Sequence, residues 1–158
     1  MSYSQTPRVA VIGGGVAGLT AATFTARAGF DTVVFAHGES VLRRNAHLEN
    51  VPGFPAGVDA RLFADLLEEQ SERNGARIED GRVVGLDVDG SFRLSLEDDE
   101  RSEFRADYVI VASWGDTAYL DAVDAIELLD RGSKTYVDVD ECGRTAVDGL
   151  YAAGRIAK

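Results

Sequence analysis

The feature that most constrains this fold is a glycine-rich turn between a short apolar strand and a helix of small residues. The apolar run Arg8–Ile12 leads directly into the pattern G-x-G-x-x-G, whose glycines are Gly13, Gly15 and Gly18. Gly13 permits the sharp turn, Gly15 lets the backbone approach a pyrophosphate, and Gly18 lets the helix lie close to the strand. Because strand, turn and helix follow in this order, the sequence predicts an α/β unit with a dinucleotide site.

The start of the predicted helix supplies the groups that a diphosphate needs. The backbone N–H groups of residues 16–19 have no acceptor within the helix, and the helix dipole adds partial positive charge at this end. We therefore predict that a cofactor's pyrophosphate lies against the turn. The candidate binding residues here are Gly13, Gly14, Gly15, Val16, Ala17 and Gly18.

The second predicted strand, Thr32–Phe35, ends without the acidic side chain that usually binds the adenosine ribose about 20 residues after the glycines. Ala36 stands at that place, and His37, Gly38 and Glu39 follow it. Two alternatives remain open for the ribose: either Glu39 reaches back to it, or backbone groups and water hold it. The departure does not affect the prediction for the pyrophosphate.

The charge balance restricts the possible partners. The 158 residues carry a net charge of −11, with 27 Asp and Glu against 16 Lys and Arg, and only Lys134 and Lys158 are lysines. An acidic surface repels nucleic acid and anionic membranes, so we expect neither as a partner. Acidity combined with scarce lysine favours a halophilic protein, and an ordinary acidic cytosolic protein is the alternative.

Cysteine usage and hydropathy indicate the compartment. The single cysteine, Cys142, excludes an internal disulfide and a Cys-x-x-Cys pair within this sequence. No apolar stretch approaches the ~18 residues of a membrane span, and no signal-peptide pattern precedes the first strand. We expect a cytoplasmic protein, one domain over residues 1–158, and no metal site.

The rest of the chain predicts further helices and strands. We expect a helix over 59–74 with Leu62, Phe63, Leu66 and Leu67 on its apolar face. Downstream, we expect a β-meander over 82–88, 91–96 and 102–105 with a turn at 98–100, a buried strand over 108–112, and a strand over 135–139.

Two segments carry no clear periodicity. Residues 37–58 are predicted to be irregular, because two prolines and two glycines within residues 52–57 preclude a helix. Residues 113–129 are predicted to be helical or irregular.

Four sequence blocks occur in an informative order. They are the glycine turn, residues 49–57 (ENVPGFPAG), residues 109–112 (VIVA), and residues 137–154, which end in GLYAAG. In this order they resemble the FAD-binding domain of thioredoxin reductases, within the pyridine nucleotide-disulfide oxidoreductase family. The resemblance implies a three-layer FAD/NAD(P)-binding, Rossmann-like α/β domain, with a central parallel sheet, a helical layer and a β-meander.

The resemblance also implies FAD as the cofactor and assigns further residues to it by position. Asn50 would hydrogen-bond near the flavin, Ala112 would lie close to the cofactor, and Gly154 would lie beside the ribityl chain. The family's Gly-Asp pair reads Gly154-Arg155 here, which makes Arg155 a candidate functional cation. The candidate cofactor-binding residues outside the glycine turn are Phe35, Ala36, Asn50, Val83, Ala112, Gly154 and Arg155.

One part of the family's pattern is missing. Its members carry a complete NADPH domain, with a second glycine fingerprint and a Cys-x-x-Cys, after an Ala-Thr-Gly strand end. Here residues 113–134 stand in that place with neither motif, and the strand end reads Ala112-Ser113-Trp114-Gly115. We therefore expect that this chain alone is not a self-sufficient thioredoxin reductase.

Two functions remain open. The first is a minimal thioredoxin-reductase-like flavoprotein, an FAD-dependent oxidoreductase or electron-transfer protein that depends on an unknown protein donor or acceptor. The alternative is a non-catalytic dinucleotide-binding or regulatory module that has lost redox activity. A homo-oligomer is possible in either case, and no catalytic residue is assigned.

Several other side chains have a plain interpretation and a functional one. We interpret Cys142 as a loop residue rather than a redox thiol, and His37 and His47 as exposed rather than as acid–base groups. Arg43 and Arg44 are interpreted as surface charges rather than phosphate ligands. Trp114 either stacks on a flavin ring or fills space left by the absent domain.

Overall fold

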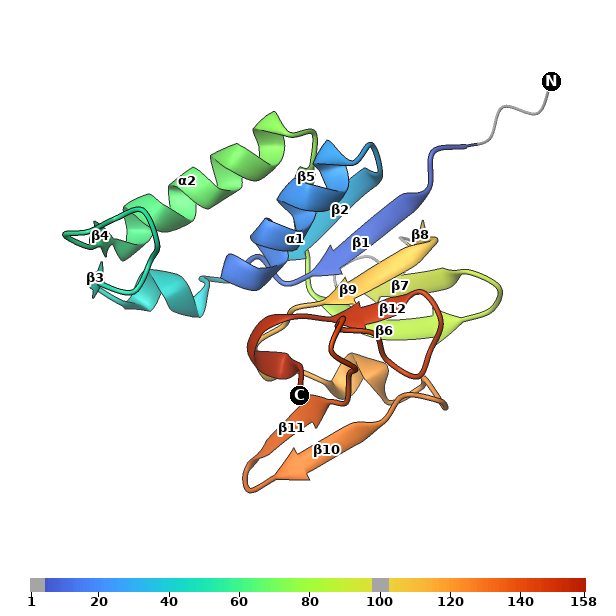
Figure 1. Cartoon of the computed structure of the whole chain (residues 1–158). Coiled ribbons are helices and arrows are strands. Elements are labelled where there is room, and N and C mark those ends of the chain that lie inside the picture. Colours follow the sequence, from blue (N-terminus) through green and yellow to red (C-terminus); the bar gives the residue numbers. More distant parts are fainter. Residues whose placement is uncertain (1–4, 98–102) are drawn as a thin grey trace.

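The core of the molecule is a five-stranded parallel sheet, seen in a computed structural model that describes residues 5–97 and 103–158. The strand order is β12-β9-β1-β2-β5, so the strand before the glycine turn is central, as predicted (Figure 1). Every pairing within this sheet is parallel. The strands are β1 (Arg8–Ile12), β2 (Asp31–Ala36), β5 (Arg77–Asp80), β9 (Tyr108–Val111) and β12 (Leu150–Ala152).

The two faces of the sheet bury alternate residues of the same strand. On β1, Val9 and Val11 pack with Leu19 and Ala22 of α1 (Val16–Arg27), while α2 (Ala60–Arg73) adds Leu67 to this layer. Ala10 and Ile12 point the other way, into a core shared with the antiparallel meander. That meander consists of β6 (Val83–Val88), β7 (Phe92–Leu96) and β8 (Glu103–Ala106). The predicted three layers of helices, parallel sheet and meander are confirmed.

Gly18 explains how closely α1 approaches the sheet. A Cβ atom built on Gly18 would overlap the carbonyl oxygen of Gly13 and touch Val11, so the helix could not keep this position with a larger residue. The glycine therefore serves the packing of helix on strand, as the motif predicts.

We predict that Gly18→Ala lowers stability by about 1–3 kcal/mol, because the added methyl meets rigid backbone rather than a flexible side chain. At roughly 2–4 °C per kcal/mol for a chain of this size, the loss would be visible in a thermal melt. Thr20→Ala, on the exposed side of the same helix, should leave the melting temperature nearly unchanged. Equal melting temperatures for the two variants would contradict the packing role.

Helix α2 begins at a side-chain cap and lies against α1 through small residues. The carboxylate of Asp59 accepts hydrogen bonds from the N–H groups of Arg61 and Leu62, at 3.0 and 2.9 Å. The Ser71 hydroxyl then donates to the carbonyl of Leu19 at 2.9 Å across the helix–helix contact. The buried residues of α2 are Ala60, Ala64, Leu67 and Ser71.

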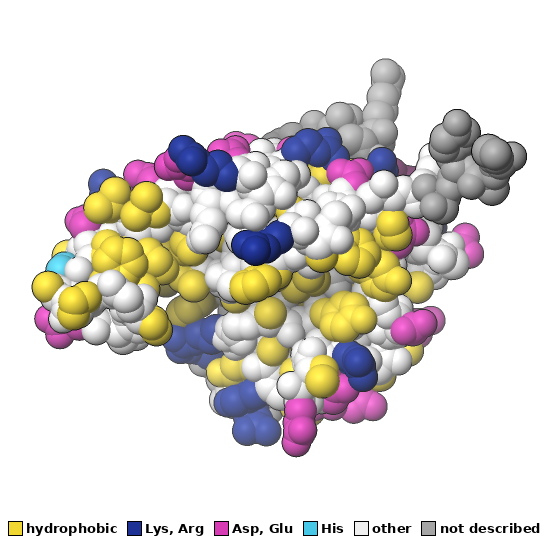
Figure 2. Space-filling view, turned by 45° about the horizontal axis from the view of Figure 1, so that its top comes forward, with side chains coloured by type: hydrophobic (Ala, Val, Ile, Leu, Met, Phe, Trp, Pro, Cys, Tyr) yellow, Lys and Arg dark blue, Asp and Glu magenta, His cyan; other side chains and the backbone are white. Residues whose placement is uncertain are grey.

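The predicted apolar face of α2 is therefore only partly correct. Leu67 is buried, but Leu62 and Leu66 remain 52% and 42% exposed, because the small residues bring a different stripe of the helix against α1. Figure 2 shows hydrophobic side chains at the end of the molecule where α2 begins and also across the middle of that face, with acidic and basic side chains among them.

Several short elements differ from the sequence prediction. Strand β5 was not predicted, and β10 (Leu128–Arg131) pairs with β11 (Lys134–Val137) as a hairpin where only the second strand was expected. The remaining short elements, mostly in the segments predicted to be irregular, are η1 (Val41–Arg44), β3 (His47–Leu48), β4 (Val58–Asp59), η2 (Ala118–Leu120) and η3 (Gly154–Ile156). The turn predicted at 98–100 lies outside the described residues.

The segment 113–134 is an integral part of the core. Tyr119, Leu120 and Val123 are buried and belong to the cluster between the sheet and the meander. Among the helices of residues 5–97 and 103–158, none has the length and apolar character needed to cross a membrane.

Candidate functional site

A groove of about 1070 Å³ runs along the carboxyl ends of the parallel strands. The chain moves from β1 to β2 on one side and later places β9 on the other side of β1, so the strand order reverses at β1. A crevice at such a reversal is where open α/β sheets bind ligands. The predicted residues that line it are Gly13, Gly14, Gly15, Val16, Ala17, Phe35, Ala36, Val83, Ala112, Gly154 and Arg155.

The glycines at this end serve different purposes. Gly13 has a φ of +113°, and a Cβ there would come 2.5 Å from the carbonyl oxygen of Ala112. A Cβ on Gly14 would come 2.8 Å from that of Ala36, and one on Gly154 would come 2.6 Å from that of Ala17. These three glycines allow the ends of β1, β2, β9 and β12 to converge.

Gly15 is different, because the chain itself leaves room for a side chain there. A Cβ on Gly15 would meet only the Ser40 hydroxyl oxygen, at an ordinary 3.8 Å, and the φ of −87° suits any residue. Gly15 caps α1 without a side-chain hydrogen bond, and the first turn holds no acidic residue. The Leu19 N–H donates to the Gly15 carbonyl at 2.9 Å, so the prediction of free N–H groups over residues 16–19 is wrong for Leu19 and holds for residues 16–18. The open space adjoins these N–H groups and the positive end of the dipole, which suits a diphosphate.

One end of the groove lies beyond β2, where an adenosine would be expected. Ala36, His37, Glu39 and Ser40 line it, and Glu39 is exposed there. The structure thus brings Glu39 to the groove, while both alternatives for the ribose stay open.

Arg43 also borders this end, but its charge is already paired. Its guanidinium lies 2.6 Å from Asp65 and 2.9 Å from Glu68 on α2, and these carboxylates raise the pKa of Arg43. Because two carboxylates already pair with this guanidinium, the result agrees with the prediction that Arg43 is not a phosphate ligand. Arg43 is half-buried against α2, however, so it is not the exposed surface charge that we predicted. Arg44 is exposed.

The opposite end of the groove lies beyond β9 and η2. The Ser113 hydroxyl donates to the Asp116 carbonyl at 2.8 Å and lies 2.6 Å from the Tyr119 hydroxyl. Because the single Ser113 hydroxyl proton goes to the Asp116 carbonyl, the Tyr119 hydroxyl is the donor to Ser113. Burial raises the pKa of Tyr119. Arg82 pairs with Asp116 at 3.3 Å.

Sequence reasoning missed this second group of groove residues. Ser113 follows a predicted site residue, Ala112, and could have been included on that ground. Tyr119 offered no signal, because nothing in an aperiodic segment indicates that its ring turns into the core beside the groove.

Two predicted residues lie outside the groove lining. Gly18 is buried on the side of α1 that faces the sheet, and it acts through packing, as described above. Asn50 is exposed, in the loop between β3 and β4 that Figure 1 shows beyond the start of α2. Asn50 is not among the residues that line the groove, so its contact with the flavin stays a prediction.

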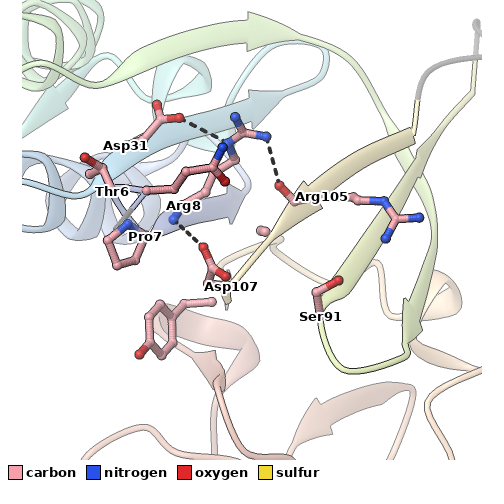
Figure 3. Close-up of a pocket in the computed structure, with 10 residues that line it drawn as sticks. Thr6, Pro7, Arg8, Asp31, Ser91, Arg105 and Asp107 are labelled. Atoms are coloured by element: carbon pink, nitrogen blue, oxygen red, sulfur yellow. Dashed lines mark hydrogen bonds and ion pairs between the residues drawn. The ribbon is translucent and has the colours of Figure 1, made fainter. Parts of the chain in front are cut away.

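A second hollow, of about 590 Å³, lies at the amino ends of the same strands. Figure 3 shows that Arg8 makes hydrogen bonds to Asp31, Arg105 and Asp107 in this hollow. The guanidinium bonds to Asp31 at 3.1 Å and to the Arg105 carbonyl at 3.4 Å, and the Arg8 backbone N–H bonds to Asp107 at 2.7 Å. These contacts tie β1, β2 and β8 together, which is a structural role.

Possible metal ligands and the single cysteine lie as follows in residues 5–97 and 103–158. No group of three His, Cys, Asp or Glu in this part of the chain is placed to hold a metal ion. Cys142 is free and exposed. Its N–H donates to the Asp140 carboxylate at 2.8 Å within a turn, as expected of a loop residue.

Comparison with known proteins supports the prediction of an FAD-binding domain. Residues 49–158 match the family model described as pyridine nucleotide-disulphide oxidoreductase, and residues 8–48 match one described as an FAD binding domain. The thioredoxin reductase of Aquifex aeolicus is 36% identical over 107 residues, which is 66% of this chain and 33% of that protein. The chain thus spans about a third of the length of the first curated relatives that it matches.

Solved structures give the same result. The atypical thioredoxin reductase from Desulfovibrio vulgaris Hildenborough is 35% identical, with a TM-score of 0.61 over 68% of this chain and 36% of its own. An oxidoreductase from Agrobacterium tumefaciens matches 98% of this chain and 91% of its own, with a TM-score of 0.79. At 14% identity, that second match shows the fold alone.

Proposed function

The chain belongs to the pyridine nucleotide-disulphide oxidoreductase family, and from this premise we propose that it is a minimal flavoprotein whose FAD exchanges electrons with a partner protein. The observation that carries the proposal is the open space at Gly15 beside the uncapped start of α1. A glycine that no protein contact requires is explained by a ligand that approaches the backbone there.

When bound, FAD would supply the redox chemistry, and the chain's residues would hold and orient it. The N–H groups at the start of α1 would hold the diphosphate, with no acidic side chain in that turn to repel it. Ala36 and Glu39 border the adenosine end, while Phe35 and Val83 give the wall an apolar surface. A groove of about 1070 Å³ is large enough for a dinucleotide.

The rival function, a dinucleotide-binding module without redox activity, is distinguished by a simple measurement. We expect the purified chain to be yellow and to show a flavin absorption spectrum. A chemical reductant should bleach this absorption under anaerobic conditions. Colourless protein that binds ADP or NAD in a titration would favour the rival.

We further propose that the acidic, lysine-poor composition is an adaptation to high salt in a cytoplasm. With a net charge of −11, screening of self-repulsion should stabilise the fold as potassium chloride rises into the molar range. A gain of about 2 kcal/mol would raise the melting temperature by roughly 4–8 °C. A melting temperature that stays level or falls across the series would identify an ordinary acidic protein.

A further inference from the structure

Trp114 and Arg155 form a stacked pair at the end of the groove beyond β9 and β12. The guanidinium carbon of Arg155 lies 4.2 Å from the centroid of the Trp114 ring, within the range of a cation–π contact. Both side chains line the groove, although they follow different strands. Trp114 is 52% exposed, so it does not fill interior space.

The position of this pair indicates which part of a dinucleotide it would meet. In a fold of this kind the ribose of the adenosine half lies beyond β2, and the diphosphate lies at the start of α1. The second half must then extend across the ends of β9 and β12. Close approaches of Gly13 to Ala112 and of Gly154 to Ala17 hold these strand ends beside the diphosphate site.

We propose that Trp114, positioned by Arg155, is a stacking platform for the aromatic ring in the second half of the dinucleotide. This inference rests on the proposed function, and it adds that the pair makes the groove prefer FAD to ADP. Because half of Trp114 stays exposed although Arg155 covers one face, surface remains for a second ring. Arg155 acts through the indole, since its charge favours that ring orientation.

The test is a titration of the flavin-free full chain with FAD and with ADP. The wild type should bind FAD more tightly than ADP, and Trp114→Ala should weaken FAD binding by about tenfold while ADP binding stays unchanged. The fluorescence of bound flavin, quenched by a stacked indole, should also rise in Trp114→Ala. Since Trp114 is exposed, circular dichroism should show the variant folded.

Arg155 variants test the positioning role separately. Arg155→Ala should lose part of the preference for FAD and regain flavin fluorescence, whereas Arg155→Lys should restore most of both, because it keeps a cation at the ring. The matched control is Tyr136→Ala. It removes a second aromatic–cation pair, with Lys158 Nζ 4.4 Å from the ring, which does not line the groove. FAD binding should be unaffected in that control.

The outcomes are distinguishable. An unchanged FAD affinity in Trp114→Ala, or an equal loss of FAD and ADP affinity, would overturn the platform. A loss of ADP affinity in Arg155→Ala would assign Arg155 to the diphosphate and overturn its positioning role. A wild-type chain that binds ADP but shows no preference for FAD would refute this inference alone. A chain that binds neither nucleotide would refute the proposed function as well.

Discussion

A Gly15→Val variant of this chain should fold normally and fail to bind FAD. The structure leaves space at Gly15, since an added Cβ would meet only Ser40, at 3.8 Å, and the backbone conformation suits a β-branched residue. The new side chain would instead occupy the approach to the N–H groups at the start of α1. Loss of two charge-assisted hydrogen bonds, at about 1.5–3 kcal/mol each, would weaken FAD binding by at least about 100-fold.

The measurement pairs an FAD titration with a thermal melt of the flavin-free protein. The matched control is Gly85→Val on β6, where an added Cβ would lie at an ordinary 3.5 Å from Ser95 and outside the groove. That variant should keep its FAD affinity. If Gly15→Val binds FAD as tightly as the wild type, the diphosphate does not lie at the glycine turn, and the assignment of the groove is wrong.

The second large effect concerns NADPH. The isolated 158-residue chain, loaded with FAD, should be bleached by a chemical reductant but hardly at all by NADPH. Hydride transfer requires a nicotinamide stacked on the flavin, and a second nucleotide site normally positions it. The sequence holds one glycine fingerprint, at residues 13–18, and residues 113–134 are too short to form a domain of about 100 residues.

The experiment is anaerobic stopped-flow absorbance of the loaded chain mixed with NADPH, with a chemical reductant as the positive control. Any flavin reduction should require an added partner protein that supplies the electrons. Rapid bleaching by NADPH without a partner would show that one groove serves both nucleotides, which would contradict our interpretation of residues 113–134.

Short-range patterns predicted the glycine turn correctly because its glycines stand at fixed spacings, directly after an apolar strand and at the start of a helix. The apolar run of β1 and the meander strands were also predictable, since alternation and β-branched content act over a few residues. Strand β5 was missed because its sequence, Arg77-Ile78-Glu79-Asp80, is polar. Only its place at the sheet edge, paired with β2 and largely exposed, makes it a strand.

The groove likewise combines residues that a local motif predicts with residues that only tertiary packing brings together. The residues that we propose to hold the diphosphate are close in sequence, so a local motif was enough to select them. The contacts of Arg43 with Asp65 and Glu68, and of Tyr119 with Ser113, join side chains whose partners depend on how loops and helices pack. No local pattern distinguishes such a pair from two exposed side chains.

The sequence by itself therefore determined the α/β class, the central parallel strand and the tight glycine turn after it, because these follow from hydrophobic periodicity and from glycine's missing side chain. The tertiary structure alone decided that Gly15 is open while its neighbours are confined, and that Asn50 lies away from the groove. It also brought together Trp114 and Arg155, which are far apart along the chain, because β9 and β12 are neighbours in the sheet. The order of strands in the sheet decides which strand ends are neighbours, and it brings together residues that are too far apart in sequence to share a local pattern.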